Sequence, residues 1–277
     1  MEQKIYFVVP GVQKGGTTYL YEMLRQHPEI FLSQTKELDH FTRSTDVAAY
    51  EANFSNAHDA KCYGDISPQY LSDDVALERI AAYRPDAKLI ILLRHPIERM
   101  ISHLQMELKR GLISSLEDVL DLPEVEIRDT YYYKNSNYVR QLKTVRQHFP
   151  EDQILIVKSE ILSKHSAKTL KKMFKFLGLT NHQFVPYDVN GKVHQAGEYR
   201  FKAVPLVINF LQARLRTYKK LVYRIIPKSF LHWIVFKIET GWNTKRSAKQ
   251  SLTDAQSTKL GAVFKESLVI WHGIPDV

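Results

Sequence analysis

The sequence has little cysteine and lacks any long apolar run. Cys62 is the only cysteine in 277 residues, which excludes an internal disulfide and a metal site built from paired cysteines. The 11 histidines show no His-Glu-x-x-His spacing. No apolar stretch approaches the roughly 18–20 residues that cross a bilayer, and an apolar strand pattern begins within a few residues of Met1. We therefore expect a cytoplasmic protein with no bound metal, signal peptide or membrane anchor.

Acidic residues are scarce in one part of the chain. Residues 213–249 hold ten Lys or Arg against a single acid, Glu239, and this excess equals the whole net charge of +9. The rest of the sequence is therefore balanced in charge. This distribution argues against a nucleic-acid-binding protein and indicates one local basic face.

The length and the 44% hydrophobic content favour one domain over residues 1–277, because such a chain can bury a single large core. No internal repeat or flexible linker divides it. Residues 201–277 are expected to form a basic helical C-terminal extension packed on that domain, with a last helix over 253–271. A helix with one apolar and one basic face can instead lie on an anionic membrane, so peripheral membrane contact is the alternative.

A glycine-rich turn joins the first predicted strand to the first predicted helix. An apolar run over residues 5–9 indicates a buried strand, and a helical pattern follows the turn. Backbone N–H groups and the positive end of the helix converge at such a turn and bind anions. Glycine allows close approach to a phosphate, threonine adds hydroxyl donors, and lysine adds a positive charge. The candidate phosphate-binding residues are Lys14, Gly15, Gly16, Thr17 and Thr18.

This turn is not an ordinary Walker A loop. Gly11 and Gly16 have the right spacing, but Thr17 stands where the motif requires lysine, and the lysine lies at position 14. No Lys-Ser/Thr pair is available to hold Mg²⁺ and a γ-phosphate. A nucleotide kinase or other P-loop phosphotransferase is therefore the disfavoured alternative. A turn that only joins strand to helix is the structural alternative.

A second element supports an anion site. Residues 89–93 form an apolar strand pattern that places Arg94 at its C-terminal end, and Pro96 is suited to begin a helix. Ser102 then lies about two turns along that helix. A guanidinium donates two parallel hydrogen bonds to a terminal phosphate.

In this order, and 80 residues apart, the Lys14 and Arg94 elements resemble those of sulfotransferases that use 3′-phosphoadenosine 5′-phosphosulfate (PAPS). The motif pattern is most similar to bacterial and heparan-sulfate-type carbohydrate sulfotransferases, over roughly residues 5–200. The resemblance implies that the glycine-rich turn holds the 5′-phosphosulfate and that Arg94 and Ser102 bind the 3′-phosphate. It also implies that Lys192 and Arg200 lie in a loop that folds over the nucleotide.

The same resemblance assigns an acceptor side. Those enzymes carry Lys-Glu followed by an aromatic pair, and Lys36 and Glu37 match the Lys-Glu pair. Their glutamate is the proposed base, so Glu37 is the expected base here. Asp39 and His40 stand where relatives often have His-Phe and are the alternatives. Without the neighbouring motifs, Lys36 and Glu37 would be interpreted as a solvated ion pair in a surface loop.

Residues 63–71 resemble the family's Gly-Glu-x-Ser/Thr-Pro-x-Tyr segment, which lines the acceptor side. Asp65 and Tyr70 are the matching candidates, and Ile66 replaces a lysine of the heparan enzymes. That replacement argues against recognition of a heparan-like polyanion. The alternative is a Ser-Pro turn that opens a helix to about Tyr83. Residues 111–136 are expected to be an irregular substrate-side loop.

The alternation of strands and helices predicts a three-layer α/β fold with a mostly parallel central sheet and a P-loop-like phosphosulfate turn. Strands that end near Pro10, Leu93 and Val157 would place the ligand at the C-terminal edge of this sheet. The expected function is transfer of the sulfuryl group from PAPS to a hydroxyl of a carbohydrate or glycolipid. The alternatives are a P-loop kinase and a membrane- or polyanion-binding protein that uses the basic C-terminal face.

Overall fold

The structure is a computed structural model that describes residues 4–33, 35–57, 59–186, 197–199, 244–246 and 252–276. Contacts divide the chain into one unit of residues 1–191 with 252–277 and a second unit of residues 192–251. The described part of the second unit is an antiparallel strand pair, β6 (Gly197–Tyr199) and β7 (Thr244–Arg246). The elements that follow belong to the first unit.

A five-stranded parallel sheet forms the centre of this unit, in the order β2-β3-β1-β4-β5. The strands are β1 (Ile5–Val9), β2 (Ile30–Leu32), β3 (Cys62–Ile66), β4 (Lys88–Leu93) and β5 (Ile154–Lys158). The predicted parallel α/β fold is confirmed. The sequence did not predict β3, because Gly64 and Asp65 interrupt its apolar pattern. Gly64 is needed there, since a Cβ atom would lie 2.4 Å from the carbonyl oxygen of Phe7 on β1.

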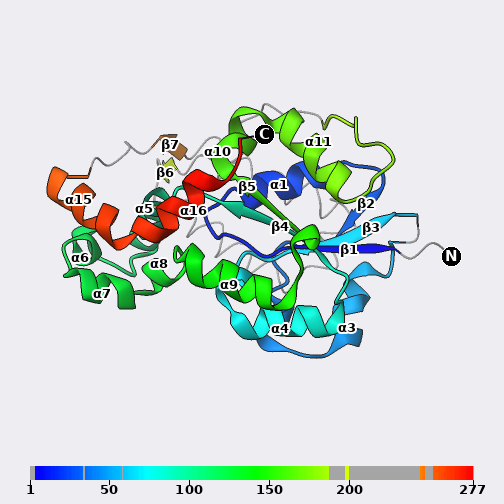
Figure 1. Ribbon diagram of the computed structural model, residues 1–277, viewed down its shortest axis with the longest axis horizontal. Coiled ribbons are helices and arrows are strands. Elements are labelled where there is room, and N and C mark those ends of the chain that lie inside the picture. The colour runs from blue at the N-terminus through cyan, green and yellow to red at the C-terminus, as the bar shows by residue number, and fades with distance from the viewer. Residues whose placement is uncertain are drawn as a thin grey trace, which may run out of the picture. The chain divides into compact units, whose positions relative to one another are not determined.

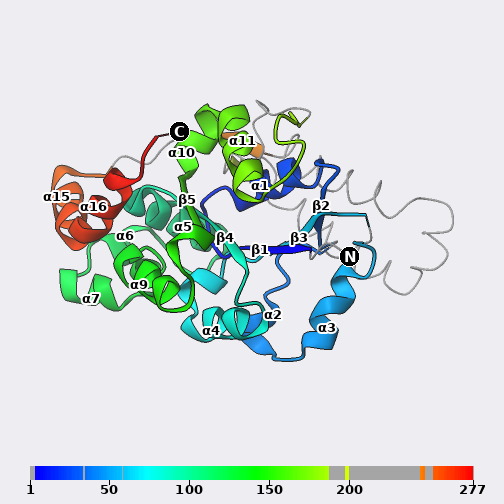
Figure 2. The same cartoon turned by 45° about the vertical axis from the view of Figure 1, so that its right-hand side comes forward.

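Helices cover both faces of the sheet because the strand side chains alternate between two apolar cores. On β1, Tyr6 and Val8 enter one core, and Phe7 and Val9 enter the other. The first core is closed by α4 (Asp74–Tyr83) and α9 (Tyr138–His148), and the second by α1 (Thr17–Leu24) and α11 (Ser166–Phe176). Figures 1 and 2 show these helix pairs on opposite sides of the sheet.

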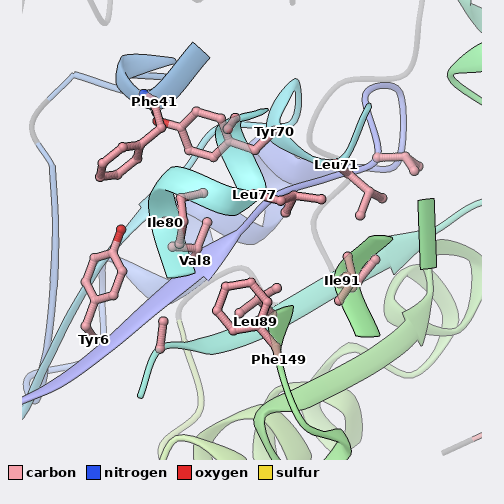
Figure 3. Packing of buried hydrophobic residues seen from close by; sticks show 14 of the residues in the cluster. Tyr6, Val8, Phe41, Tyr70, Leu71, Leu77, Ile80, Leu89, Ile91 and Phe149 are labelled. Carbon is pink, nitrogen blue, oxygen red and sulfur yellow. Dashed lines mark hydrogen bonds between the residues drawn. The ribbon is translucent and has the colours of Figure 1, made fainter. Parts of the chain in front are cut away.

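The first core is rich in aromatic side chains. Tyr6 and Val8 of β1 face Leu77 and Ile80 of α4, and Leu89 of β4 lies beside them (Figure 3). Burying a large apolar side chain contributes about 1.5–3 kcal/mol. This packing fixes the strand from which the glycine-rich turn leaves.

A third apolar cluster lies along α5 (Pro96–Arg110), which begins at the predicted proline. The prediction that residues 111–136 are irregular is wrong, because three short helices occupy them. These are α6 (Glu117–Leu120), α7 (Glu124–Asp129) and α8 (Tyr131–Lys134). With four to six residues each, they are too short to show helical periodicity.

The predicted last helix is two helices, α15 (Asp254–Val263) and α16 (Lys265–Gly273), which contact α7 and α9. The remaining described helices are α2 (His40–Arg43), α3 (Val47–Glu51), α10 (Ser159–Lys164) and the 3₁₀ turns Ala52–Phe54, Tyr70–Ser72 and Glu151–Gln153. Within the described residues, no helix is both long and apolar enough to cross a membrane. The predicted basic extension lies mostly outside the described residues.

Candidate functional site

The two glycines of the turn meet different structural demands. Gly16 precedes α1 with a φ of 88°, a left-handed conformation that costs glycine little. A Cβ atom on Gly15 would lie 2.8 Å from the carbonyl oxygen of Val12, so only glycine fits there without movement. A Cβ atom on Gly16 would meet nothing within 4 Å. The backbone at Gly16 is therefore uncovered on its Cβ side.

The turn is tied to the neighbouring strand and helix. The amide of Val12 donates to the carbonyl of Leu92 at 2.7 Å, and the amide of Leu92 donates to the carbonyl of Gly11 at 2.8 Å. The hydroxyl of Ser159, at the start of α10, donates to the carbonyl of Gly15 at 2.6 Å. These bonds hold the turn in place before any ligand binds, which is the preorganisation that an anion site needs.

Lys14 lies in a strongly positive environment. It adopts a φ of 70°, and its ammonium lies 3.8 Å from the sulfur of Met106 on α5. Burial, followed by repulsion from Arg94, lowers the pKa of Lys14 to about 8. Lys109, Arg110 and Arg99 also repel the ammonium. A buried lysine surrounded by other cations is characteristic of a site that binds a negatively charged ligand.

The second predicted element meets the first at Arg94. The Nη1 atom of Arg94 donates to the carbonyl of Lys14 at 3.3 Å, and its Nη2 atom lies 3.5 Å from Glu98 Oε2. The hydroxyl of Tyr138 fixes the Arg94 backbone by donating to its carbonyl at 2.6 Å. The predicted junction of the two elements at the sheet edge is thus present.

Three of the other predicted donor-side residues lie within the described part of the chain, and two lie outside it. Thr17 and Ser102 are buried, in α1 and α5 respectively, and Thr18 is half-buried. Lys192 and Arg200 lie outside the described residues. Their roles, like that of Ser102, stay predictions.

Two buried polar residues of α5 were missed by the sequence reasoning. Arg99 is fully buried and His103 is 2% exposed. Arg99 Nη1 lies 3.2 Å from His103 Nδ1, so the imidazole nitrogen accepts from the guanidinium. Burial, then the charges of Arg99 and Lys14, lower the pKa of His103 to about 3. Their i, i+4 spacing was the available signal, but such pairs usually mark a solvated helix face.

The predicted base lies in a loop with two residues in the left-handed conformation. Glu37 has a φ of 60° and Asp39 a φ of 47°. The Lys36 ammonium pairs with the Glu37 carboxylate, whose side chain is 39% exposed. Asp39 is buried, and burial followed by the nearby Glu37 raises its pKa. Asp39 Oδ1 and His40 Nε2 have no hydrogen-bond partner in the described part of the chain.

Asp65 and Tyr70 lie beneath this loop. Both are fully buried, and Asp65 accepts hydrogen bonds from Ser67 Oγ and Tyr70 Oη, each at 2.9 Å. The amide of Asp39 donates to the same Ser67 oxygen at 3.0 Å. Burial raises the pKa of Asp65 to about 7. Both residues are therefore interior, and their role on the acceptor side stays a prediction.

The acceptor-side segment packs on the start of the glycine-rich turn. The amide of Leu71 donates to the carbonyl of Pro10 at 2.8 Å. A Cβ atom on Gly11 would lie 2.7 Å from Cβ of Leu71, so glycine is needed for this approach. The predicted donor and acceptor sides are therefore joined through residues 65–71. Across the described ranges, no group of three or more metal-binding side chains is close enough to hold an ion.

Comparisons with known proteins agree with this geometry. The family model described as a sulfotransferase domain matches residues 5–194. The crystal structure of a sulfotransferase from Alicyclobacillus acidocaldarius is similar, with a TM-score of 0.59 and 25% identity over 79% of this chain and 96% of that chain.

The curated relatives are longer than this chain. Heparan sulfate glucosamine 3-O-sulfotransferase 3A1 of Mus musculus is 29% identical over 244 residues, which are 80% of this chain and 61% of the relative. The membrane-associated sulfotransferase kil1 of Dictyostelium discoideum is 33% identical over 119 residues, 40% of this chain and 25% of the relative. The chain thus spans about three fifths of the mouse relative's length.

Proposed function

The chain belongs to the sulfotransferase domain family, and from this premise we propose that it transfers the sulfuryl group of PAPS to a hydroxyl of a carbohydrate or glycolipid. The observation that carries the proposal is the bond from Arg94 to the Lys14 carbonyl. It brings both predicted phosphate-binding elements to one edge of the sheet.

The donor side fits a nucleotide with phosphates at both ends of its ribose. The turn from Lys14 to Thr18 would hold the 5′-phosphosulfate through backbone N–H groups and the lysine ammonium. Arg94 and Ser102 would bind the 3′-phosphate. The fit rests on the open backbone at Gly16 and on the lowered pKa of Lys14, which reflects its burial and the nearby cations.

When bound, PAPS supplies the sulfuryl group, and its 5′-phosphate oxygen is released as the acceptor oxygen bonds to sulfur. Lys14 and the preorganised amides would stabilise the negative charge that develops on the leaving phosphate. Glu37 would accept the proton of the acceptor hydroxyl, which requires hydrogen-bond reach in the bound complex. Asp39 is the alternative base, because its raised pKa makes its carboxylate more basic.

The proposal goes beyond sulfuryl transfer when it names a carbohydrate or glycolipid as the acceptor. It is supported by the heparan sulfate 3-O-sulfotransferase relative and by the Lys36-Glu37 pair. Ile66 is buried at the end of β3, where the heparan enzymes have lysine. We therefore propose an acceptor with less negative charge than heparan sulfate.

Peripheral membrane contact through the basic extension is a separate proposal. Ten of its residues between 213 and 249 are Lys or Arg, and such a segment is attracted to anionic lipids. Flotation with phosphatidylserine vesicles and with phosphatidylcholine vesicles would test it. Equal recovery with both vesicles would rule out an electrostatic membrane contact.

Calorimetric titration with adenosine 3′,5′-bisphosphate tests the proposed function first, with ATP as the comparison and no added metal. Tight bisphosphate binding with weak ATP binding would support the donor site and justify a screen of carbohydrate acceptors with labelled PAPS. A preference for ATP in a second titration with added Mg²⁺ would instead support the kinase alternative. Absence of bisphosphate binding would overturn the proposal.

A further inference from the structure

Arg99 is a buried cation that the proposed mechanism does not use. Its side chain on α5 is fully buried. Its Nε atom donates to Ser136 Oγ, its Nη2 atom donates to the Tyr132 carbonyl at 2.6 Å, and its Nη1 atom donates to His103 Nδ1. All three acceptors are neutral groups.

A buried arginine is normally neutralised by a carboxylate, because desolvating an unpaired charge is costly. In the described part of the chain, no carboxylate forms an ion pair with Arg99. The Oε1 atom of Glu107, one turn beyond His103, lies 3.7 Å from His103 Nε2 and 3.4 Å from Arg110 Nη1. Burial lowers the pKa of Arg99 to about 10, which leaves it charged at neutral pH. Among the described residues, the charge of Arg99 therefore has no direct carboxylate partner.

This charge comes from the helix face that contacts the glycine-rich turn. Arg99, His103 and Met106 lie on one face of α5, at i, i+4 and i+7, and Met106 is the residue that Lys14 contacts. Arg99 repels Lys14, and Arg94 repels Arg99 in turn. His103 stays neutral between Arg99 and Lys14. Lys14 and Arg94, the candidate anion-binding side chains, thus lie in an electrostatic field to which the buried guanidinium of Arg99 contributes.

We propose that Arg99 is a positioning residue whose unpaired charge strengthens nucleotide binding at the Lys14 turn without touching the nucleotide. The anion, once bound, supplies the counter-charge that the protein interior lacks. This inference rests on the proposed function, since it requires a phosphorylated ligand at that turn. The three neutral hydrogen-bond acceptors keep the guanidinium fixed, so the field is present before binding.

Two substitutions separate charge from packing. Arg99→Gln and Arg99→Lys both remove the planar fork that holds Ser136 and Tyr132, but only Arg99→Lys keeps the charge. Calorimetry with adenosine 3′,5′-bisphosphate at pH 7 should show at least about tenfold weaker binding for Arg99→Gln and less than about threefold for Arg99→Lys. Arg140→Gln is the matched control, because Arg140 forms an exposed pair with Asp74 on the surface. Its affinity should match that of wild type.

The pH dependence supplies a readout that loss of packing would not move. A buried lysine at position 99 loses its proton at lower pH than arginine does, so Arg99→Lys should lose bisphosphate affinity at lower pH than wild type. Arg94, Lys14, His103 and Arg110 remain in both proteins. This comparison tests the inference even if Arg99→Gln does not fold, which circular dichroism would reveal.

Equal weakening by Arg99→Gln and Arg99→Lys at pH 7 would reduce Arg99 to a packing role and overturn the inference. Wild-type affinity in a folded Arg99→Gln protein would do the same, as would identical pH profiles for Arg99→Lys and wild type. Wild-type protein that does not bind the bisphosphate would instead contradict the proposed function. The two failures are therefore distinguishable.

Discussion

The guanidinium of Arg94 donates a hydrogen bond to the backbone carbonyl of Lys14, with an Nη1–O distance of 3.3 Å. This bond joins two segments that are 80 residues apart. It makes the geometry of the glycine-rich turn depend on the strand end that carries Arg94. The donor side should therefore respond to changes in either residue, but in different ways.

Lys14→Ala should lower kcat by about 10²–10³, the loss typical when one preorganised donor to a developing negative charge is removed. The reason is that the ammonium would act on charge that grows on the leaving 5′-phosphate. Turnover of labelled PAPS measures the effect. Lys143→Ala, an exposed lysine on α9, is the control. Near-normal turnover of Lys14→Ala would contradict the assignment.

Binding of adenosine 3′,5′-bisphosphate should be accompanied by proton uptake at about pH 9. Lys14 has its pKa lowered to about 8, so at this pH the free protein carries mostly the neutral amine. A bound anion favours the charged form and raises the pKa again. The phosphate groups of the ligand titrate near pH 6, so they contribute little to the proton uptake at pH 9.

Calorimetry in two buffers with different ionisation enthalpies would measure this uptake. It should decrease below about pH 7, where Lys14 is already protonated in the free protein. It should also disappear in Lys14→Ala. Uptake that is unchanged in this variant would place the proton on another group.

Arg94→Ala should reduce the preference for a 3′-phosphorylated nucleotide. Hydrogen bonds to charged groups contribute about 1.5–3 kcal/mol, so the ratio of affinities for adenosine 3′,5′-bisphosphate and adenosine 5′-phosphate should fall by about 10- to 100-fold. Glu98→Gln, which removes the partner at 3.5 Å, should keep the preference. An unchanged ratio in Arg94→Ala would exclude the 3′-phosphate role.

Glu37→Gln should lower kcat by about 10²–10⁴, the usual contribution of a general base. Bisphosphate affinity should not change, because Glu37 belongs to the acceptor side. Asp39→Asn is the informative comparison. If Asp39→Asn loses turnover and Glu37→Gln does not, Asp39 is the base and the proposed assignment is wrong.

The sequence predicted the elements whose side-chain patterns are uniform. Continuous apolar residues marked β1 and β4, and the proline at position 96 marked the start of α5. β3 was missed because its pairing requires Gly64, whose role depends on the neighbouring Phe7 and not on local propensity. A requirement that comes from a tertiary contact leaves no periodic pattern in the sequence.

Within the site, the sequence identified residue types but not their environment. Lys14 and Glu37 have positive φ values, which sequence does not predict for residues other than glycine. Arg99 received no role from the sequence, because arginine is seldom fully buried. The motif placed Asp65 on the acceptor side but did not show that β3 buries it beneath residues 36–41.

That burial gives the last prediction, which concerns stability. The pKa of Asp65 is raised to about 7 in the folded protein, above its ordinary value of 3.8. Between about pH 4 and pH 7 the folded state therefore holds a proton that the unfolded chain has released. The contribution of Asp65 to the free energy of unfolding must then fall as pH rises through this window.

Asp65→Asn removes the titrating group, so its unfolding free energy should fall less steeply with pH than that of wild type. Urea unfolding at several pH values measures both slopes, with the exposed Asp129→Asn at the end of α7 as the control. If the wild-type and Asp65→Asn slopes coincide, the buried carboxyl does not titrate in this range, and Ser67 and Tyr70 stabilise its charged form more strongly than burial destabilises it.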